Sequence, residues 1–160
     1  MITMNDVYKT VRTSNNKQEL IEIIRAVVPG IFEARSIICY LESNPIFDSE
    51  LKLEVASKVV ERYRSFEIVD DIIECASNIE LMKRLYNADV DKFGAFVAVN
   101  IIDQDELERM YMNGTIEVKR AVASNTNTRV EFLGKIIQEA TDEQTKKYAE
   151  DTLKEISGRN

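Results

Sequence analysis

The chain contains no histidine among its 160 residues. This absence excludes Ser-His-Asp and Cys-His catalysis and HExxH zinc sites, and it removes the usual proton carrier near neutral pH. Any catalysis would need Asp, Glu, Lys, Tyr or Cys side chains. We therefore predict that the protein is not an enzyme and that it holds no metal ion and no cofactor.

Cysteine is also scarce. Cys39 and Cys75 are too few and too far apart in the sequence for a zinc or iron–sulfur ligand set. Each lies close to a pair of isoleucines, at 37–38 and at 72–73. We therefore expect both to be reduced, buried thiols with a structural role.

Long apolar runs are missing as well, and there are only five glycines and two prolines. A chain of this length buries roughly 70% of its unfolded surface, enough for one continuous core. We therefore predict a single domain over residues 1–160. No uncharged run approaches the ~20 apolar residues that a membrane span needs. The N-terminal MITMNDVYK also lacks the basic and apolar segments of a secretion signal, so we expect no membrane association and a cytoplasmic location.

One pattern recurs along most of the chain and is clearest in AVASNTNTRVEFL, residues 121–133. An apolar run ends at Ser124-Asn125, and Thr128 stands three residues before Glu131. Asn tolerates the left-handed conformation that ends a helix, and Thr followed three positions later by Glu forms a capping box on the next helix. The pattern therefore predicts one helix ending and another beginning within a few residues.

Similar signals divide the chain into helix pairs. Leu81, Leu107 and Leu133 are evenly spaced by the length of one short pair, within the period of about 20–50 residues typical of repeat proteins. Ser-Asn or Val-Asn pairs occur at 14–15, 43–44, 77–78 and 99–100, and the predicted helix caps are Asn16, Asp48 or Ser49, Ser77, Asp103, Thr115, Thr128 and Thr141.

Apolar residues spaced three and four apart predict helices between these signals. A buried strand competes with a helix only at 95–99, within the apolar FGAFVAV, and the helical flanks favour a helix. Gly94 would allow close packing there, and Asn113-Gly114 would end a helix in the left-handed conformation. The predicted helices cover 5–12, 17–28, 31–42, 49–64, 66–76, 79–87, 90–99, 104–113, 116–124, 129–140 and 142–156.

The segment 118–137, with VKRAVASNTNT followed by Glu131 and Leu133, resembles the variant leucine-rich repeat and, more broadly, HEAT-type α-solenoid repeats. The resemblance covers about a fifth of the chain closely. Thr126 and Arg129 replace two prolines usual in that repeat, and the cysteine cluster of some members is absent. The resemblance implies an all-α fold of short helix pairs stacked as a HEAT-like α-solenoid, and a tendency to bind other macromolecules. About five units are expected, at roughly 16–44, 47–77, 77–100, 103–125 and 128–157.

Two acidic patterns imitate metal sites. Asp89 and Asp91 with Gly94 look like the start of a calcium loop, but Phe93 occupies a ligand position and Asn100 stands where a bidentate Glu belongs. A second cluster lies at 103–108, where a helix N-terminus favours acidic residues through its dipole. We therefore predict no metal at either place.

The distribution of charge is uneven, because the net charge of −7 lies within residues 65–114 while both flanks are balanced. Acidic residues spaced three and four apart at 67–74 form one stripe on a predicted helix. Like charges at this spacing cost about 0.2–0.5 kcal/mol per pair, which suits either a solvated face or a surface for a basic partner. The candidate partner-binding residues, including the expected continuation onto later helices, are Glu67, Asp70, Asp71, Glu74, Asp91 and Glu117.

These observations predict a non-enzymatic protein–protein interaction scaffold with an acidic central surface, which binds a basic protein or peptide. One alternative is a HEAT-like nucleic-acid-associated protein or enzyme, as in some DNA glycosylases. Another is an acidic mimic of nucleic acid directed at a DNA-binding protein. Direct nucleic-acid binding needs a basic track. The pI near 4.8 and the lack of basic runs longer than pairs such as Lys119-Arg120 argue against it.

Overall fold

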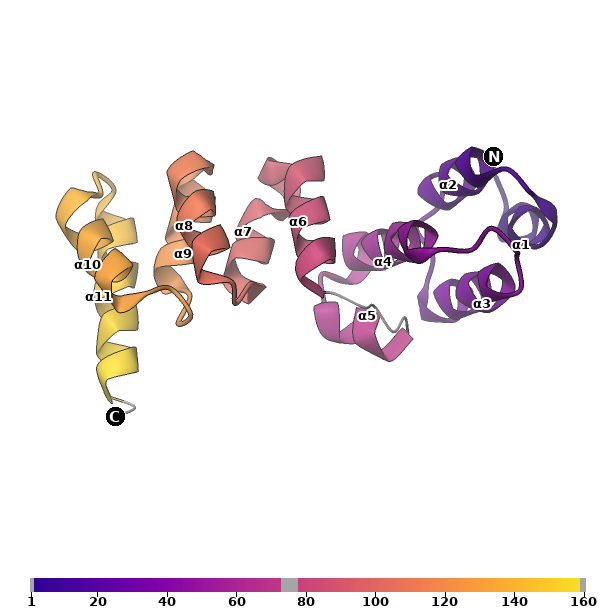
Figure 1. The fold of residues 1–160 in the computed structure, drawn as a ribbon. Helices are drawn as coiled ribbons and strands as arrows, with labels where there is room; N and C mark the ends of the chain where they lie inside the picture. The colour runs from indigo at the N-terminus through magenta and orange to yellow at the C-terminus, as the bar shows by residue number, and fades with distance from the viewer. Residues whose placement is uncertain (1, 73–77, 159–160) are drawn as a thin grey trace. The chain divides into compact units, whose positions relative to one another are not determined.

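The computed structural model describes residues 2–72 and 78–158. Over these residues the chain is all α-helical and contains no strand, which confirms the predicted fold class at this level and excludes the strand at 95–99. Residues 73–77, with Cys75 and the predicted cap Ser77, lie outside the described residues. The described helices (Figure 1) are α1 (Met4–Thr13), α2 (Lys17–Arg25), α3 (Ile31–Glu42), α4 (Ser49–Tyr63), α5 (Phe66–Ile72), α6 (Asn78–Ala88), α7 (Val90–Asn100), α8 (Gln104–Asn113), α9 (Ile116–Ser124), α10 (Val130–Glu139) and α11 (Glu143–Gly158).

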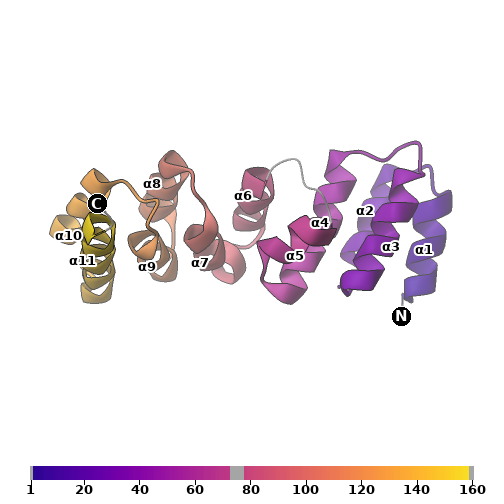
Figure 2. The ribbon, with the colours of Figure 1, turned by 90° about the horizontal axis from the view of Figure 1, so that it is seen from below.

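The chain divides into two compact units, Met1–Leu81 and Met82–Asn160, and the division falls within α6. In the first unit α3 packs against α1 and α5, and α2 packs against α4. Figure 2 shows α1 and α3 side by side, in agreement with their contact. Helices that alternate in the sequence are therefore neighbours in space within this unit.

The second unit follows the same rule. In it α9 packs against both α7 and α11, and adjacent helices pair as α8 with α9 and α10 with α11. Gly94 of α7 lies so close to α9 that an added Cβ would be 2.6 Å from Cγ2 of Val118, which confirms the close packing predicted for this glycine. The fully buried side chains of this unit include Leu107, Met110, Val118, Val122, Leu133 and Ala149.

The face that α3 buries corrects the prediction for Cys39. Its buried residues, Ala34, Ile37, Ile38 and Leu41, follow the spacing of one helix face. Cys39 falls on the opposite side of the helix and is a free, exposed thiol. The neighbouring isoleucines are buried, but the helix turns Cys39 away from them.

Most predicted helix starts are confirmed. The side chain of Asn16 accepts hydrogen bonds from the amides of Gln18 and Glu19, 3.0 and 3.3 Å away. Asp48, Asp103 and Thr115 likewise accept amide hydrogen bonds at the starts of α4, α8 and α9. The first helix, predicted from residue 5, begins at Met4 instead, because Thr3 caps it and forms a capping box with Asp6.

The cap predicted at Thr128 is wrong. The N-cap of α10 is Arg129, which makes no side-chain cap hydrogen bond. Thr128 is buried instead, and its Oγ1 donates a 2.7 Å hydrogen bond to the carbonyl of Val122. The hydroxyl therefore stabilises the end of α9 rather than the start of α10.

The cap predicted at Thr141 is also wrong. The carboxylate of Asp142 accepts hydrogen bonds from the amide and the hydroxyl of Thr145, at 2.8 and 2.7 Å, at the start of α11. A carboxylate in this position also interacts favourably with the helix dipole.

The asparagines that follow helices act through their side chains. Asn125 has an extended backbone, with φ −84° and ψ 120°, rather than the predicted left-handed one. Its buried Nδ2 donates to the carbonyls of Ala98, Val99 and Ile101, at 2.8, 3.2 and 2.9 Å. Carbonyls in the last turn of a helix lack intrahelical partners. Asn125 therefore supplies hydrogen-bond donors to the carbonyls at the end of α7, the helix that packs against its own helix α9.

Asn44 repeats this arrangement in the first unit. It follows α3, is buried, and donates to the carbonyls of Val11 and Ser14 at the end of α1, at 3.0 and 2.9 Å. In both cases Oδ1 accepts the amide two residues later, from Ile46 at 3.1 Å and from Asn127 at 2.8 Å. In each unit an asparagine thus links two alternate helices, α3 to α1 in the first unit and α9 to α7 in the second.

The Asn-Gly turn likewise differs from prediction. Gly114 ends α8 with an extended backbone, φ −87° and ψ 170°. A Cβ at Gly114 would lie 2.5 Å from the carbonyl oxygen of Met110 and 2.5 Å from Cγ1 of Val118. Glycine is therefore required here by a close approach and not by a left-handed backbone.

Candidate protein-binding surfaces

The structure describes the acidic stripe of residues 67–74 only in part. Glu67 is exposed and lies in the first turn of α5. Asp70 and Asp71 also belong to α5, but their side chains are outside the described part of the chain, and so is Glu74. The prediction that these four carboxylates share one face stays a prediction.

The two later acidic residues of the predicted surface do lie on neighbouring helices. Asp91 and Glu117 are exposed, and each is the second residue of its helix, in α7 and α9 respectively. These helices pack against each other. Neither carboxylate forms an ion pair with any described residue. Both carboxylates are therefore open to solvent or to a partner, and Glu117 also acts at longer range on Arg120 of its own helix.

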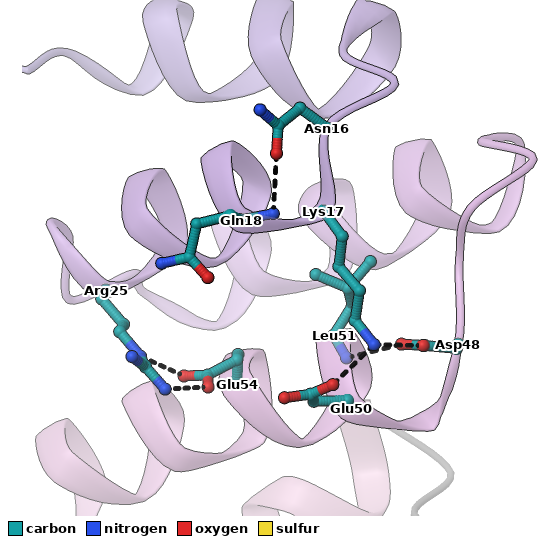
Figure 3. A network of polar contacts seen from close by, with 8 residues as sticks. All are labelled: Asn16, Lys17, Gln18, Arg25, Asp48, Glu50, Leu51 and Glu54. Carbon is teal, nitrogen blue, oxygen red and sulfur yellow. Dashed lines mark hydrogen bonds and ion pairs between the residues drawn. The ribbon is translucent and has the colours of Figure 1, made fainter.

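Other carboxylates form ion pairs that link helices of the first unit. Figure 3 shows Arg25 of α2 holding both oxygens of Glu54 of α4, at 3.0 and 2.6 Å. The Glu54 side chain is only 4% exposed, so the guanidinium compensates a charge that would be costly alone. Lys17 pairs with Asp48 and Glu50 at 2.6 and 2.5 Å, and this contact lowers the pKa of Asp48 and raises that of Lys17.

The acidic cluster at 103–108 also has structural partners. Asp105 and Glu108 of α8 both bind Arg129, the N-cap of α10, at 2.6 and 2.8 Å. Glu106 is buried and pairs with Arg109 of its own helix. Among the described residues no group of acidic or cysteine side chains is arranged to hold a metal ion. Asp105 and Glu108 therefore join α8 to the start of α10.

A groove of about 270 Å³ lies in the second unit, between the turn that joins α8 to α9 and the turn that joins α10 to α11. Its walls come from all four of these helices. The lining residues are Tyr111, Met112, Ile116, Lys119, Phe132, Lys135, Ile136, Glu139, Ala140, Thr141, Asp142 and Thr145.

The groove has an apolar floor and an apolar rim. Tyr111 and Phe132 meet edge to face, with ring centroids 5.4 Å apart and an interplanar angle of 88°. Ile136 beside them is 2% exposed, whereas Met112 and Ile116 at the rim are 63% and 39% exposed. Aromatic pairs in this geometry are favourable beyond their buried area, so the floor is already assembled in the free chain.

Charged residues surround this apolar centre. The ammonium of Lys119 lies 5.7 Å from the centre of the Tyr111 ring and has no carboxylate partner among the described residues. Lys135 is 4.0 Å from Glu139, a loose contact between exposed side chains. Burial raises the pKa of Tyr111, and the nearby carboxylates add to that shift, so its hydroxyl stays protonated at neutral pH.

Asp142, the remaining carboxylate in the groove, is already engaged. The guanidinium of Arg120 binds both of its oxygens, at 3.0 and 2.8 Å. This contact and the hydrogen bonds from Thr145 hold the pKa of Asp142 well below its usual range. The free charge at the groove is therefore positive, in contrast to the net charge of the chain.

Sequence reasoning did not find this groove. Its residues come from four helices, and no local spacing brings Lys119 together with Phe132 and Ile136. One signal was available, because Met112 and Ile116 are large apolar residues on either side of the Asn-Gly turn at 113–114. A turn is normally exposed, so apolar residues beside it are candidates for contact with a partner.

Comparison of the chain with protein-family models, with curated proteins and with solved structures finds no match. Within residues 2–72 and 78–158, none of the helices combines the length and the apolar character that crossing a bilayer requires.

Proposed function

We propose that this protein is a non-enzymatic scaffold for protein–protein interaction, built from stacked α-helix pairs similar to variant leucine-rich and HEAT-type repeats. The neighbours of each helix support the stacking. Alternate helices contact each other as α1, α3 and α5 in one unit and as α7, α9 and α11 in the other. The absence of histidine from the sequence supports a function in binding rather than in catalysis.

The observation that carries this proposal is the groove of the second unit with its exposed apolar rim. Met112 is 63% exposed and Ile116 is 39% exposed, beside an apolar floor. Exposed apolar groups that border a concavity are typical of interaction sites. The volume of about 270 Å³ is below the roughly 300–1,000 Å³ of sites that enclose a whole small molecule. The size suits one or two side chains of a protein partner.

The proposal also includes a basic partner for the acidic surface. Asp91 and Glu117 on α7 and α9 form no ion pair among the described residues, whereas other carboxylates such as Glu54 and Asp105 tie helices together. Exposed charges contribute mainly to association rate and specificity, and salt weakens them. We place Glu67 with the same proposed surface, together with the predicted neighbours on its helix, Asp70, Asp71 and Glu74.

Selection from a displayed library of random peptides tests the scaffold and its acidic surface. We expect the folded chain to enrich basic peptides whose affinity falls at high salt. The double variant Asp91→Lys with Glu117→Lys should weaken these peptides by about tenfold or more. Glu131→Lys is the matched control, because Glu131 is also exposed and is also the second residue of its helix, α10.

Two results would count against the proposal in different ways. If the basic peptides bind the double variant and the wild type equally, the acidic surface is only a solvated face. If the folded chain enriches no peptide of any kind, the scaffold function itself is wrong.

A further inference from the structure

The geometry of the groove points to a particular ligand. We infer that it binds a short segment of a partner protein in which a large apolar or aromatic side chain stands next to a carboxylate. This inference rests on the proposed function as a protein-binding scaffold and concerns a surface separate from the acidic one.

The shape of the groove defines the apolar half of the ligand. The edge-to-face pair of Tyr111 and Phe132 and the buried Ile136 form a floor that needs no rearrangement. Met112 and Ile116 line the same groove and are exposed, so an inserted side chain would bury apolar surface against them. Large side chains inserted into such preformed pockets supply most of the affinity of protein interfaces.

The charges define the polar half of the ligand. Lys119 lies over the Tyr111 ring with no carboxylate partner among the described residues, and Lys135 lines the same groove. Of the two carboxylates in the groove, Asp142 is held at both oxygens by Arg120. A carboxylate next to the inserted side chain would reach Lys119 without displacing an existing ion pair.

A basic segment fits this groove less well. Its cation would approach Lys119 and Lys135, and it would have to compete with Arg120 for Asp142. The second carboxylate, Glu139, lies 66% exposed with Lys135 at 4.0 Å, where solvent screens its charge. The groove therefore discriminates against the basic ligands proposed for the acidic surface.

The test is a second selection from the random peptide library, read by deep sequencing on the wild type and on three variants. Lys119→Glu reverses the free charge, and Met112→Ser removes an exposed apolar group. Lys147→Glu is the matched control, since Lys147 is exposed, forms no ion pair with a described residue and does not line the groove. Unchanged thermal unfolding of each variant shows that the fold is kept.

We expect one class of peptides to bind the wild type and Lys147→Glu equally and to lose about tenfold or more in affinity on Lys119→Glu and on Met112→Ser. These peptides should be enriched, relative to the input library, in Phe, Leu or Met next to Asp or Glu. Replacing the carboxylate in such a peptide by the amide should reproduce the loss on wild type and have no further effect on Lys119→Glu.

The inference is overturned if the peptides sensitive to Lys119→Glu are basic, or if no peptide distinguishes that variant from the control. It is also overturned if the wild type self-associates in sedimentation and Met112→Ser abolishes the association, because a second copy of the chain would then occupy the groove. In each case peptides that depend on Asp91 and Glu117 would still support the scaffold.

Discussion

Replacing Asn125 by Ala should be among the most destabilising single changes in the second unit. The residue is 4% exposed, and its Nδ2 donates to three carbonyls at the end of α7. A typical hydrogen bond contributes about 1 kcal/mol net, and a buried acceptor left without a donor costs about 1–3 kcal/mol. Water would reach some of these carbonyls in the variant, so we expect a loss of about 2–4 kcal/mol in the free energy of unfolding.

The conservative change Asn125→Asp separates the donor from the shape of the side chain. At neutral pH a carboxylate would face three carbonyl oxygens, so this variant should be less stable than Asn125→Ala. Burial among acceptors raises the folded-state pKa of the new carboxyl above its ordinary value of about 3.9. The deficit should therefore shrink as the pH falls toward that value, because the protonated carboxyl again donates.

Urea denaturation followed by circular dichroism measures both variants. Thr126→Ala is the neighbouring control, since Thr126 is only partly buried, and we expect it to change stability by less than about 0.5 kcal/mol. If Asn125→Ala costs no more than Thr126→Ala, the side chain does not tie the two helices together and our explanation of the recurring asparagine is wrong.

Three further predictions concern packing, charge and the exposed thiol. Gly94→Ala should destabilise the fold by about 1–3 kcal/mol, because its Cβ would lie 2.6 Å from a methyl group of α9. Gly134→Ala, whose Cβ would have nothing within 4 Å, should instead stabilise α10 by about 0.5–1 kcal/mol. Equal effects of the two variants in thermal unfolding would contradict this. The contact between Arg120 and Asp142 lowers the pKa of the Asp142 carboxyl, so the stability that this ion pair contributes is present above about pH 4 and is lost as the pH falls. Arg120→Gln should therefore reduce the loss of unfolding free energy at acid pH. An unchanged loss at acid pH would count against the ion pair. Cys39 should react quickly with a charged thiol reagent in the native state because it is exposed, and protection until unfolding would show that it is buried.

The helices could be predicted from the sequence because they depend on local patterns. Apolar spacing along each segment and capping side chains such as Asn16 and Asp103 act over one or two turns. The helices of the described residues accordingly begin and end within a few residues of the predicted limits. A cap prediction was wrong where the side chain hydrogen-bonds to another nearby group. The hydroxyl of Thr128, for example, donates to the carbonyl of Val122 instead of capping α10.

The role of the recurring asparagine could not be predicted because its partners are distant in the sequence. The pattern identified Asn125 and Asn44 as ends of helices, and a left-handed backbone is the usual local explanation. In the structure their side-chain amides reach the helix two before them in the sequence. Asn125 donates to Ala98 of α7, and Asn44 donates to Val11 of α1. Such a contact is visible only once the neighbouring helices are packed against each other.

Of the two candidate sites, the acidic surface could be predicted from local sequence patterns and the groove could not. A stripe such as the one that begins at Glu67 can be read from the spacing of one helix, and the packing of α7 on α9 places Asp91 and Glu117 on neighbouring helices. The groove required four helices to meet, and its charge depends on Arg120 neutralising Asp142. Neither the meeting of the helices nor the neutralisation has a signature in a single segment.

Amide hydrogen exchange of the chain with and without its most enriched apolar and acidic peptide tests the proposed binding function most directly. We expect binding to slow exchange in the turns that border the groove, at 111–119 and 136–145, and to leave α1 and α2 of the first unit unchanged. The same peptide should protect neither turn in Lys119→Glu. Protection confined to other helices, or an unchanged exchange pattern at saturating peptide, would contradict a binding site in this groove.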